Sequence, residues 1–258
     1  MQRLNKLSAI FILFSILIYF NTGEVFSQEN DVADNTSLYG NDEFWSDIGE
    51  DYPEDEVSIA DPIEPFNRAM FYVNDKLYFY VLKPVAKGYN FVLPEVARKK
   101  INNAFYNVRF PGRFVNDLLQ LKFKYASVEL GRFVVNTTVG ILGLFRPADK
   151  VSFLETPPPK DTDLTFGKWG IGNGFYIVWP VFGPNTIRST VGLAGDFFLD
   201  PITYIDPDWA SLTVKTEGKL NDTSLRLGEY ENFKENSMDP YVSMRNGYVK
   251  YRQNQLGK

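Results

Sequence analysis

Cysteine and histidine are both absent from the 258 residues. A chain without cysteine forms no disulfide bond and offers no thiol for a thioether-linked lipid. A chain without histidine has no Ser-His-Asp triad, no Cys-His pair and none of the common zinc sites. Acidic residues with metal-ligand spacing do not cluster beyond the N-terminal region either. The sequence therefore predicts no catalytic residues, no metal and no other cofactor.

An unbroken apolar run of bilayer-spanning length is also missing. Residues 7–20 form an uncharged apolar run of 14 residues, whereas a membrane-spanning helix needs about 20. This run follows Arg3 and Lys6, and Val25 and Ser27 then occupy the positions three and one before a cleavage point. We expect residues 1–27 to be a cleaved signal peptide that exports the protein; a retained anchor is the alternative.

Positive charge is missing from the segment that follows. Residues 28–61 contain 12 acidic residues and no Lys or Arg, whereas residues 62–258 contain 19 acidic and 25 basic residues, a net charge of +6. Because residues 28–60 lack hydrophobic periodicity, we expect an acidic disordered linker there. A basic body on an acidic linker fits contact with anionic head groups or folding of the linker onto the body, and a solvated tail is the alternative. The basic residues form no stripe, so no nucleic acid is expected as a partner.

Helical periodicity and start signals dominate residues 61–252. Asp61, Pro62 and Glu64 form a helix-start signal, and we favour a capping role for these carboxylates over acid-base chemistry. The first helix is expected to end at Pro84. Further helices are expected from Pro94, Pro111, Lys122, Asp200-Pro201, Asp206-Pro207, at 220–233 and from Asp239-Pro240. The predicted fold class is therefore all-α, with six to eight helices, a domain at 61–252 and a C-terminal tail at 253–258.

Two segments break the ordinary amphipathic pattern. Residues 135–145 are apolar nearly all round, and Gly140 and Gly143 there allow close backbone approach, so this segment is either central core or a lipid-facing surface. Residues 165–201 have no charged residue between Lys168 and Arg188, and their glycines and prolines exclude a continuous helix. We expect a hairpin-like loop that packs against the protein or sits at a lipid boundary.

The candidate site residues come from this second segment. They are the glycines that give flexibility, the apolar anchors and two flanking charges: Gly170, Gly172, Gly174, Phe175, Tyr176, Trp179, Pro180, Phe182, Arg188 and Asp196. Arg188 and Asp196 are either an ordinary ion pair, two independent surface residues, or polar groups that line a passage for lipid head groups. The spacing of the glycines does not fit a dinucleotide-binding loop, because its third glycine would fall at Phe175.

Five motifs taken together resemble one known family. They are DPIEPFNRAM at 61–70, KPVA at 83–86, RFVVNTTVGILGL at 132–144, FGKWGIGNGFYIVWPVFGPNTIR at 166–188 and SMDPYVSMRNGY at 237–248. In this order they resemble the MlaA/VacJ family of Gram-negative outer-membrane proteins. The residues in these motifs to which the resemblance gives a structural role are Asp61, Pro62, Glu64, Phe66, Asn67, Arg68, Asn136, Gly140, Gly143, Asp239, Pro240 and Tyr241.

The resemblance implies a fold and a function. The fold would be an all-helical ring in the inner leaflet of the outer membrane, at its periplasmic face, with an amphipathic central channel and a mobile hairpin-like loop. The function would be non-enzymatic removal of mislocalised phospholipid from the outer leaflet, beside a trimeric porin and towards a soluble periplasmic carrier. Family members carry a lipid on cysteine, which this sequence lacks. The alternatives are a structural envelope adaptor bound to a porin and, less favoured, a lipid hydrolase.

Overall fold

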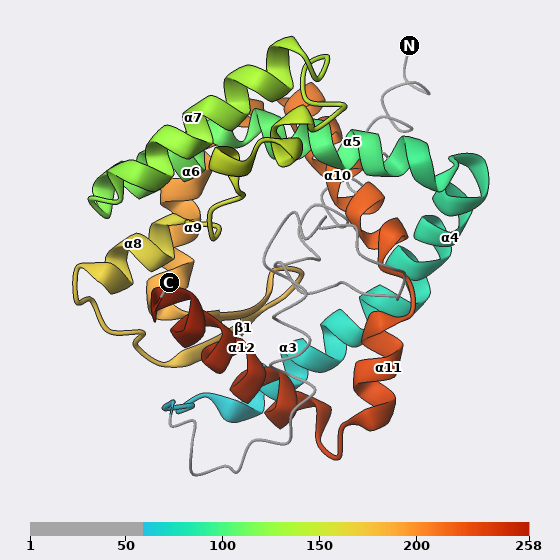
Figure 1. Ribbon diagram of the computed structural model, residues 1–258. Helices are drawn as coiled ribbons and strands as arrows, with labels where there is room; N and C mark the ends of the chain where they lie inside the picture. The colour runs from blue at the N-terminus through green and yellow to red at the C-terminus, as the bar shows by residue number, and fades with distance from the viewer. Residues whose placement is uncertain (1–58, 258) are drawn as a thin grey trace.

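The structure, a computed structural model, describes residues 59–257 and is mainly helical (Figure 1). The expected signal peptide and nearly all of the expected linker lie outside the described residues. The helices are α3 (Glu64–Leu77), the π-helix η2 (Tyr78–Leu82), α4 (Lys83–Val92), α5 (Glu95–Val108), α6 (Phe110–Leu119), α7 (Phe123–Thr138), the 3₁₀ turns η3 (Pro147–Lys150) and η4 (Ser152–Leu154), α8 (Thr162–Lys168), α9 (Ile187–Leu199), η5 (Pro201–Tyr204), α10 (Asp208–Leu225), α11 (Glu229–Asn236) and α12 (Pro240–Gly257). One antiparallel hairpin, β1 (Tyr176–Trp179) with β2 (Gly183–Thr186), completes the fold.

The elements are arranged as a ring around a common centre (Figure 1). From α3 the ring passes through η2 to α4, then to α10, α5, α7 and α6, each packed on the next. It continues from α6 to α9, α8 and α12, and α12 packs on the hairpin, which closes the ring on α3. The all-α ring expected from the sequence is therefore confirmed. Within residues 59–257, no helix has the length and apolar character needed to cross a membrane.

The first helical path runs further than the sequence predicts. We expected a helix end at Pro84, but Pro84 lies in the first turn of α4. A proline is tolerated there, because the backbone N–H groups of a first turn form no hydrogen bond within their own helix. The five-residue π-helix η2 joins α3 to α4 and absorbs the change of direction. The chain therefore passes from α3 to α4 as one continuous helical path, without an intervening loop.

Three predictions in the C-terminal half are wrong in detail. The single helix expected at 220–233 is divided, because α10 ends at Leu225 and Gly228 takes a left-handed φ of 109° before α11. Asp200-Pro201 starts only the 3₁₀ turn η5. Residues 253–257, expected as part of a tail, continue α12, and Gln255 in this segment is buried.

The hydrophobic core is built around the hairpin. Tyr176 of β1 is fully buried, and its ring contacts the rings of Tyr241 and Tyr248 on α12. Ile59 packs on the same core, and the carbonyl oxygen of Ala60 accepts a hydrogen bond of 2.9 Å from the Tyr176 amide. The folded body therefore includes the last two residues of the expected linker.

Candidate functional site

Two asparagines of α3 fix the hairpin to the ring. The Asn67 amide donates to the Tyr176 carbonyl oxygen at 3.0 Å and accepts from the Val178 amide at 2.8 Å. Seven residues further along the same face of α3, Asn74 donates to the Trp179 carbonyl oxygen at 2.9 Å and accepts from the Val181 amide at 2.6 Å. Each side chain thus replaces a neighbouring strand for part of β1. The hairpin itself is held as a fixed wall of the ring.

The family-motif residues at the two ends of the domain meet beside this wall. The Asp61 carboxylate accepts hydrogen bonds from Asn67, at 2.7 Å, and from the Tyr241 hydroxyl. It does not cap α3, which begins without a side-chain cap, so the expected capping role of Asp61 is wrong. Asp239, by contrast, accepts from the Tyr241 amide at 3.0 Å, and pairs with Arg68 at 3.0 Å. These contacts join α3 to α12.

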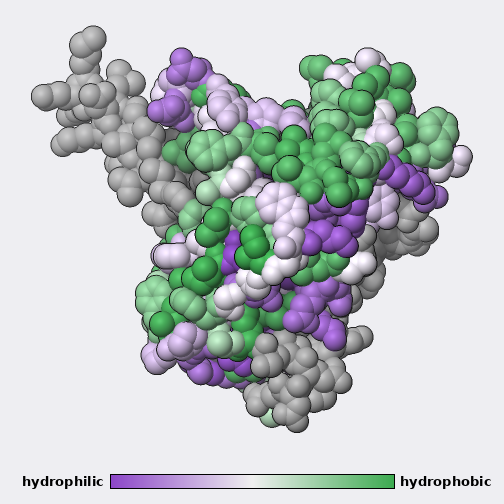
Figure 2. All heavy atoms as spheres, turned by 90° about the vertical axis from the view of Figure 1, so that its left-hand side faces the viewer, coloured by the Kyte–Doolittle hydropathy of each residue, from purple (hydrophilic) through white to green (hydrophobic). Residues whose placement is uncertain are grey.

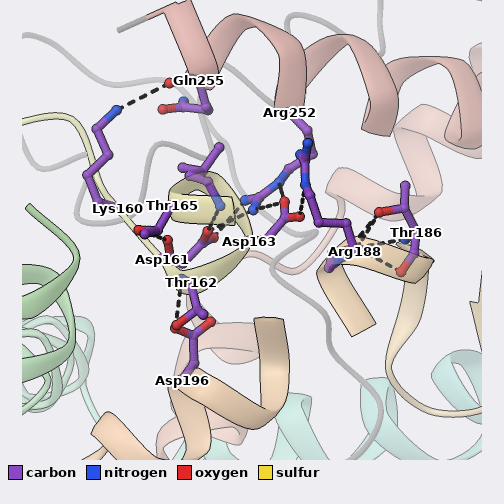
Figure 3. Close-up of polar contacts among 12 residues, drawn as sticks. Lys160, Asp161, Thr162, Asp163, Thr165, Thr186, Arg188, Asp196, Arg252 and Gln255 are labelled. Carbon is purple, nitrogen blue, oxygen red and sulfur yellow. Dashed lines mark hydrogen bonds and ion pairs between the residues drawn. The ribbon is translucent and has the colours of Figure 1, made fainter. Parts of the chain in front are cut away.

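A buried ion-pair cluster holds α8, α9 and α12 together (Figure 3). Arg188 of α9 pairs with Asp163 at 2.6 Å, and Arg252 of α12 pairs with Asp161 at 2.8 Å and also with Asp163. Burial alone would raise the pKa of the Asp163 carboxyl, but Arg252 and Arg188 outweigh it and lower that pKa. Asp163 therefore stays ionised at neutral pH, and its ion pairs, with that of Asp161, clamp the three helices.

Arg188 and Asp196, considered as a possible ion pair from the sequence, have different partners in the structure. Arg188 contacts Asp163, whereas the Asp196 carboxylate accepts hydrogen bonds from the amide and hydroxyl of Thr162, at 2.9 and 2.6 Å (Figure 3). Both side chains tie α9 to the start of α8, so their geometry is that of structural contacts.

The glycine-rich loop between α8 and β1 is hydrogen-bonded to the ring, and two of its glycines have open space around them. Arg188 donates from its side chain to the Ile171 carbonyl oxygen at 2.9 Å, and from its amide to the Asn173 carbonyl oxygen at 3.1 Å. The Trp169 indole donates to the Leu119 carbonyl oxygen at 3.1 Å. A Cβ atom at Gly170 or Gly172 would meet nothing within 4 Å, and Trp169 and Ile171 are exposed.

The aromatic anchors that follow are unequal in burial. Tyr176 is buried, and Phe175 and Phe182 are partly buried. Trp179 is partly buried and donates from its indole to Thr190 at 2.9 Å, whereas Pro180 in the hairpin turn is exposed. The ten candidate residues therefore divide into the loop, the hairpin and the two charged residues of α9, Arg188 and Asp196.

Side-chain polarity is inverted relative to an ordinary soluble domain. Among the described residues, 30 polar or charged side chains but only 20 hydrophobic ones are buried, whereas 30 large hydrophobic ones are exposed. Helix α7 illustrates this, because it buries Glu129, Arg132 and Asn136 and exposes Leu130 and Val134. Figure 2 shows a broad hydrophobic patch across the upper part of one face, bordered by hydrophilic residues. An exposed apolar area of this kind marks an interaction with a partner or a lipid phase.

Residues 135–145, expected as either core or lipid-facing surface, belong to this exposed exterior. Val139 and Leu142 are each 70% exposed. The segment turns sharply because Gly143 has a φ of 90°, and a Cβ at Gly140 would lie 2.3 Å from the Phe145 carbonyl oxygen. The buried Asn136 connects the two sides of this turn, because its side chain accepts a hydrogen bond from the Ala148 amide at 3.1 Å.

Sequence reasoning missed Asn74, Asp161, Asp163 and Arg252. Asn74 had a signal, since it lies seven residues after Asn67 and therefore on the same face of the helix. Asp161 had one too, because it precedes α8 and caps it by accepting from the Leu164 amide at 2.8 Å. Asp163 and Arg252 are far apart in the chain, so nothing in the sequence alone pairs them.

Fold and site together define a class of protein: a helical ring with a polar, ion-paired interior and an apolar exterior. The MlaA lipoprotein family matches residues 59–255. The relatives include an uncharacterised protein of Rickettsia conorii, 32% identical over 199 residues, which are 76% of this chain and 78% of the relative. The intermembrane phospholipid transport system lipoprotein MlaA of Escherichia coli is 29% identical over 196 residues, 75% of this chain and 77% of the relative.

A solved structure agrees with these sequence comparisons. It comes from work on the structural basis for maintenance of bacterial outer membrane lipid asymmetry. It superposes with a TM-score of 0.68 at 29% sequence identity and covers 76% of this chain and 99% of the other. The chain belongs to the MlaA lipoprotein family.

Proposed function

We propose that this protein removes mislocalised phospholipid from the outer leaflet of an outer membrane and passes it on without chemical change. The observation that carries the proposal is the inverted ring, which has an apolar exterior and polar groups packed inside. Its family membership, and the description of its Escherichia coli relative as part of a phospholipid transport system, support the same conclusion.

The physical requirement for such transport is a path with two surfaces. A phospholipid head group cannot cross hydrocarbon at low cost, and its acyl chains cannot cross water. A ring that lies in one leaflet can offer polar groups to the head group while its apolar parts remain in contact with lipid. No bond is broken in this process, so it needs no nucleophile and no acid-base pair.

We infer that the ring lies at the periplasmic face of the outer membrane, held there by its apolar exterior. The 258 residues contain no cysteine to carry an acyl chain, so burial of exterior side chains would supply the attachment, at about 25 cal/mol per Å². A trimeric porin is the expected neighbour, and a soluble periplasmic carrier is the expected acceptor. Affinity of that carrier would give the transport its direction.

We infer that the loop containing Gly170, Gly172 and Gly174 gates the lipid path. Gly170 and Gly172 have open space around them and Arg188 holds the loop by two hydrogen bonds, whereas the adjoining hairpin is fixed to α3 by four. A movable segment next to a rigid wall is the arrangement that gating requires. Phe175, Trp179 and Phe182 would provide the apolar side of the path.

Deletion of the gene in the source bacterium tests the transport proposal. Surface-exposed phosphatidylethanolamine, labelled on intact cells with a membrane-impermeant amine reagent, should increase and should fall again on complementation. Sensitivity to detergent should increase in parallel. An unchanged outer leaflet, with a porin still co-purifying with the protein, would favour the adaptor alternative. Release of fatty acid or head group from labelled phospholipid by purified protein would favour a hydrolase.

A further inference from the structure

Three arginines from separate elements gather around Tyr106 and Asp149, outside the loop and the hairpin. The Arg113 guanidinium of α6 lies 3.7 Å from the ring centre of Tyr106, and that of Arg146 lies 5.1 Å from it. Arg132 of α7 joins them through Asp149, with which both Arg132 and Arg146 form ion pairs. The proposed transport path uses none of these residues.

The three arginines share a small set of carboxylate partners. Arg113 pairs with Glu129 at 3.1 Å, and Arg132 and Arg146 share a single carboxylate oxygen of Asp149. The three guanidiniums therefore form their ion pairs with two carboxylates. Arg132 and Arg146 are nearly completely buried, with side chains 1% and 5% exposed. A buried positive charge is stable only when an anion or several acceptors compensate it.

Several donors of these buried arginines have no acceptor within residues 59–257. They are Nε of Arg132 and both Nε and Nη1 of Arg146. A guanidinium does not lose its proton in proteins, so these N–H groups remain donors at any physiological pH. The Tyr106 ring face attracts the charge but gives the in-plane N–H groups no oxygen. Burial also lowers the pKa of Arg146, which is consistent with incomplete compensation.

The residues around the cluster indicate how a ligand could reach these donors and what chemistry it would have. Asp149, whose side chain is 30% exposed, connects the cluster to solvent, and Arg146 also donates to Thr156, an exposed residue, at 3.4 Å. The neighbouring segments expose Phe145 and Phe153, the latter 77% exposed. An anion with several oxygens would fit the donors, and an apolar extension of it would find contacts outside.

We propose that Arg146 and Arg132, supported by Arg113, form a binding site for a phosphate or phosphodiester group. Such a group presents several oxygens to a guanidinium fork and would give the buried arginine donors the acceptors that they lack among the described residues. The group can be free phosphate or the phosphodiester of a lipid head group. This inference goes beyond lipid transport, because binding of the anion is measured without any movement of lipid.

Calorimetric titration of the full-length protein in nonionic detergent tests the site. The probes are inorganic phosphate and glycerophosphoglycerol, a phosphodiester head group without acyl chains, and sodium chloride at equal ionic strength is the blank. We expect one saturable site for at least one probe. Arg146→Gln should weaken it about 10-fold or more, since charged hydrogen bonds are lost. The matched control Arg68→Gln alters an arginine whose Nε and Nη1 have carboxylate partners, and should bind as the unaltered protein does.

The outcomes separate the two sources of the anion. Preference for glycerophosphoglycerol identifies a lipid head-group site, and preference for inorganic phosphate identifies a site for the free ion. If Arg146→Gln does not fold, Arg146→Lys keeps the charge but loses the fork, and the same weakening is expected. Thermal unfolding then adds a second readout, because a bound anion raises the midpoint of the unaltered protein more than that of the variant. Equal binding by the variants and the unaltered protein, or no saturable binding of either probe, overturns the proposal.

Discussion

At the scale of single residues, charge compensation inside the ring links elements that are distant in the sequence. Asp163 has two arginine partners on two helices, and Arg252 has two carboxylate partners at the start of α8. In a buried network each charge depends on the others, so loss of one member leaves the rest uncompensated. Composition could predict many charges in the body, but only the fold brings residues 89 positions apart into contact.

Replacement of Arg252 by methionine should therefore destabilise the protein strongly. The change keeps most of the apolar stem but leaves Asp161 and Asp163 without their main partner. We expect the free energy of unfolding in detergent to fall by about 3–5 kcal/mol. Arg68→Met, which removes a half-exposed arginine from surface ion pairs, should cost at most about 1 kcal/mol. Equal losses in the two variants would contradict a central role for the buried cluster.

A second residue-scale prediction concerns pH. Burial, with Glu129 nearby, raises the pKa of Asp117 to about 7. The folded protein therefore keeps this proton between about pH 4 and 7, where the unfolded chain has lost it. Since the unfolded state then binds fewer protons, the free energy of unfolding falls as pH rises through this range. The slope from this one group is about 1.4 kcal/mol per pH unit.

Asp117→Asn should remove that slope. Chemical unfolding at pH 5 and pH 7 should show that the variant gains stability relative to the unaltered protein as the pH rises. Above pH 8 a second effect has the opposite sign, because burial lowers the pKa of Lys160 to about 8. Deprotonation of Lys160 in the folded state then raises the free energy of unfolding with pH. An unchanged difference between variant and unaltered protein at pH 5 and pH 7 would contradict the assignment to Asp117.

At the scale of elements, several helix starts were predictable, whereas the starts of α8 and α9 and several helix ends were not. Starts depend on local chemistry, such as Asp239 capping α12 or Pro111 in the first turn of α6. Ends depend on tertiary packing, as in the continuation of α3 through η2 past Pro84. The hairpin was predicted, but its fixation by Asn67 and Asn74 was not, because an asparagine gives no sequence sign of its partner.

The element that tests gating is the glycine-rich loop, and its three glycines are not equivalent. Gly170 and Gly174 have positive φ values of 87° and 69°, and a Cβ at Gly174 would lie 2.9 Å from the Cβ of Ile187. Alanine at these two positions therefore strains the backbone as well as stiffening it. Gly172 has open space around it and no positive φ, so Gly172→Ala changes flexibility alone.

Gly172→Ala should slow lipid removal several-fold at unchanged or slightly increased stability. The reason is that alanine restricts the loop without creating a clash. Surface-exposed phospholipid in the complemented deletion strain and thermal unfolding of the purified protein provide the two measurements. Gly88→Ala in α4, also in open space, is the matched control and should remove lipid normally. If Gly172→Ala behaves as Gly88→Ala does, loop flexibility does not limit transport.

At the scale of the whole molecule, the sequence predicts amphipathic helices but not which of their faces the ring buries. Periodicity shows that α7 has a polar and an apolar face, but it cannot show which face the ring buries. The structure places Glu129, Arg132 and Asn136 inside and leaves Leu130, Val134 and Val139 outside. This assignment makes the apolar surface available to lipid, and it gives the membrane proposal a direct test.

Glutamate at both Val134 and Val139 should weaken attachment to lipid vesicles about 10-fold or more. The side chains are 49% and 70% exposed, so the substitutions leave the interior packing intact, while a charge moved into lipid costs a few kcal/mol. Flotation with vesicles of phosphatidylethanolamine and phosphatidylglycerol measures the bound fraction. The control, Asn236→Glu with Gln253→Glu, adds the same charge at two exposed polar positions and should float almost as the unaltered protein does. Because both variants carry two extra negative charges, repulsion by the anionic lipid is equal, and the difference between them reports the apolar exterior alone. Equal flotation of the two variants would mean that the exposed face of α7 faces water or a protein partner instead of lipid.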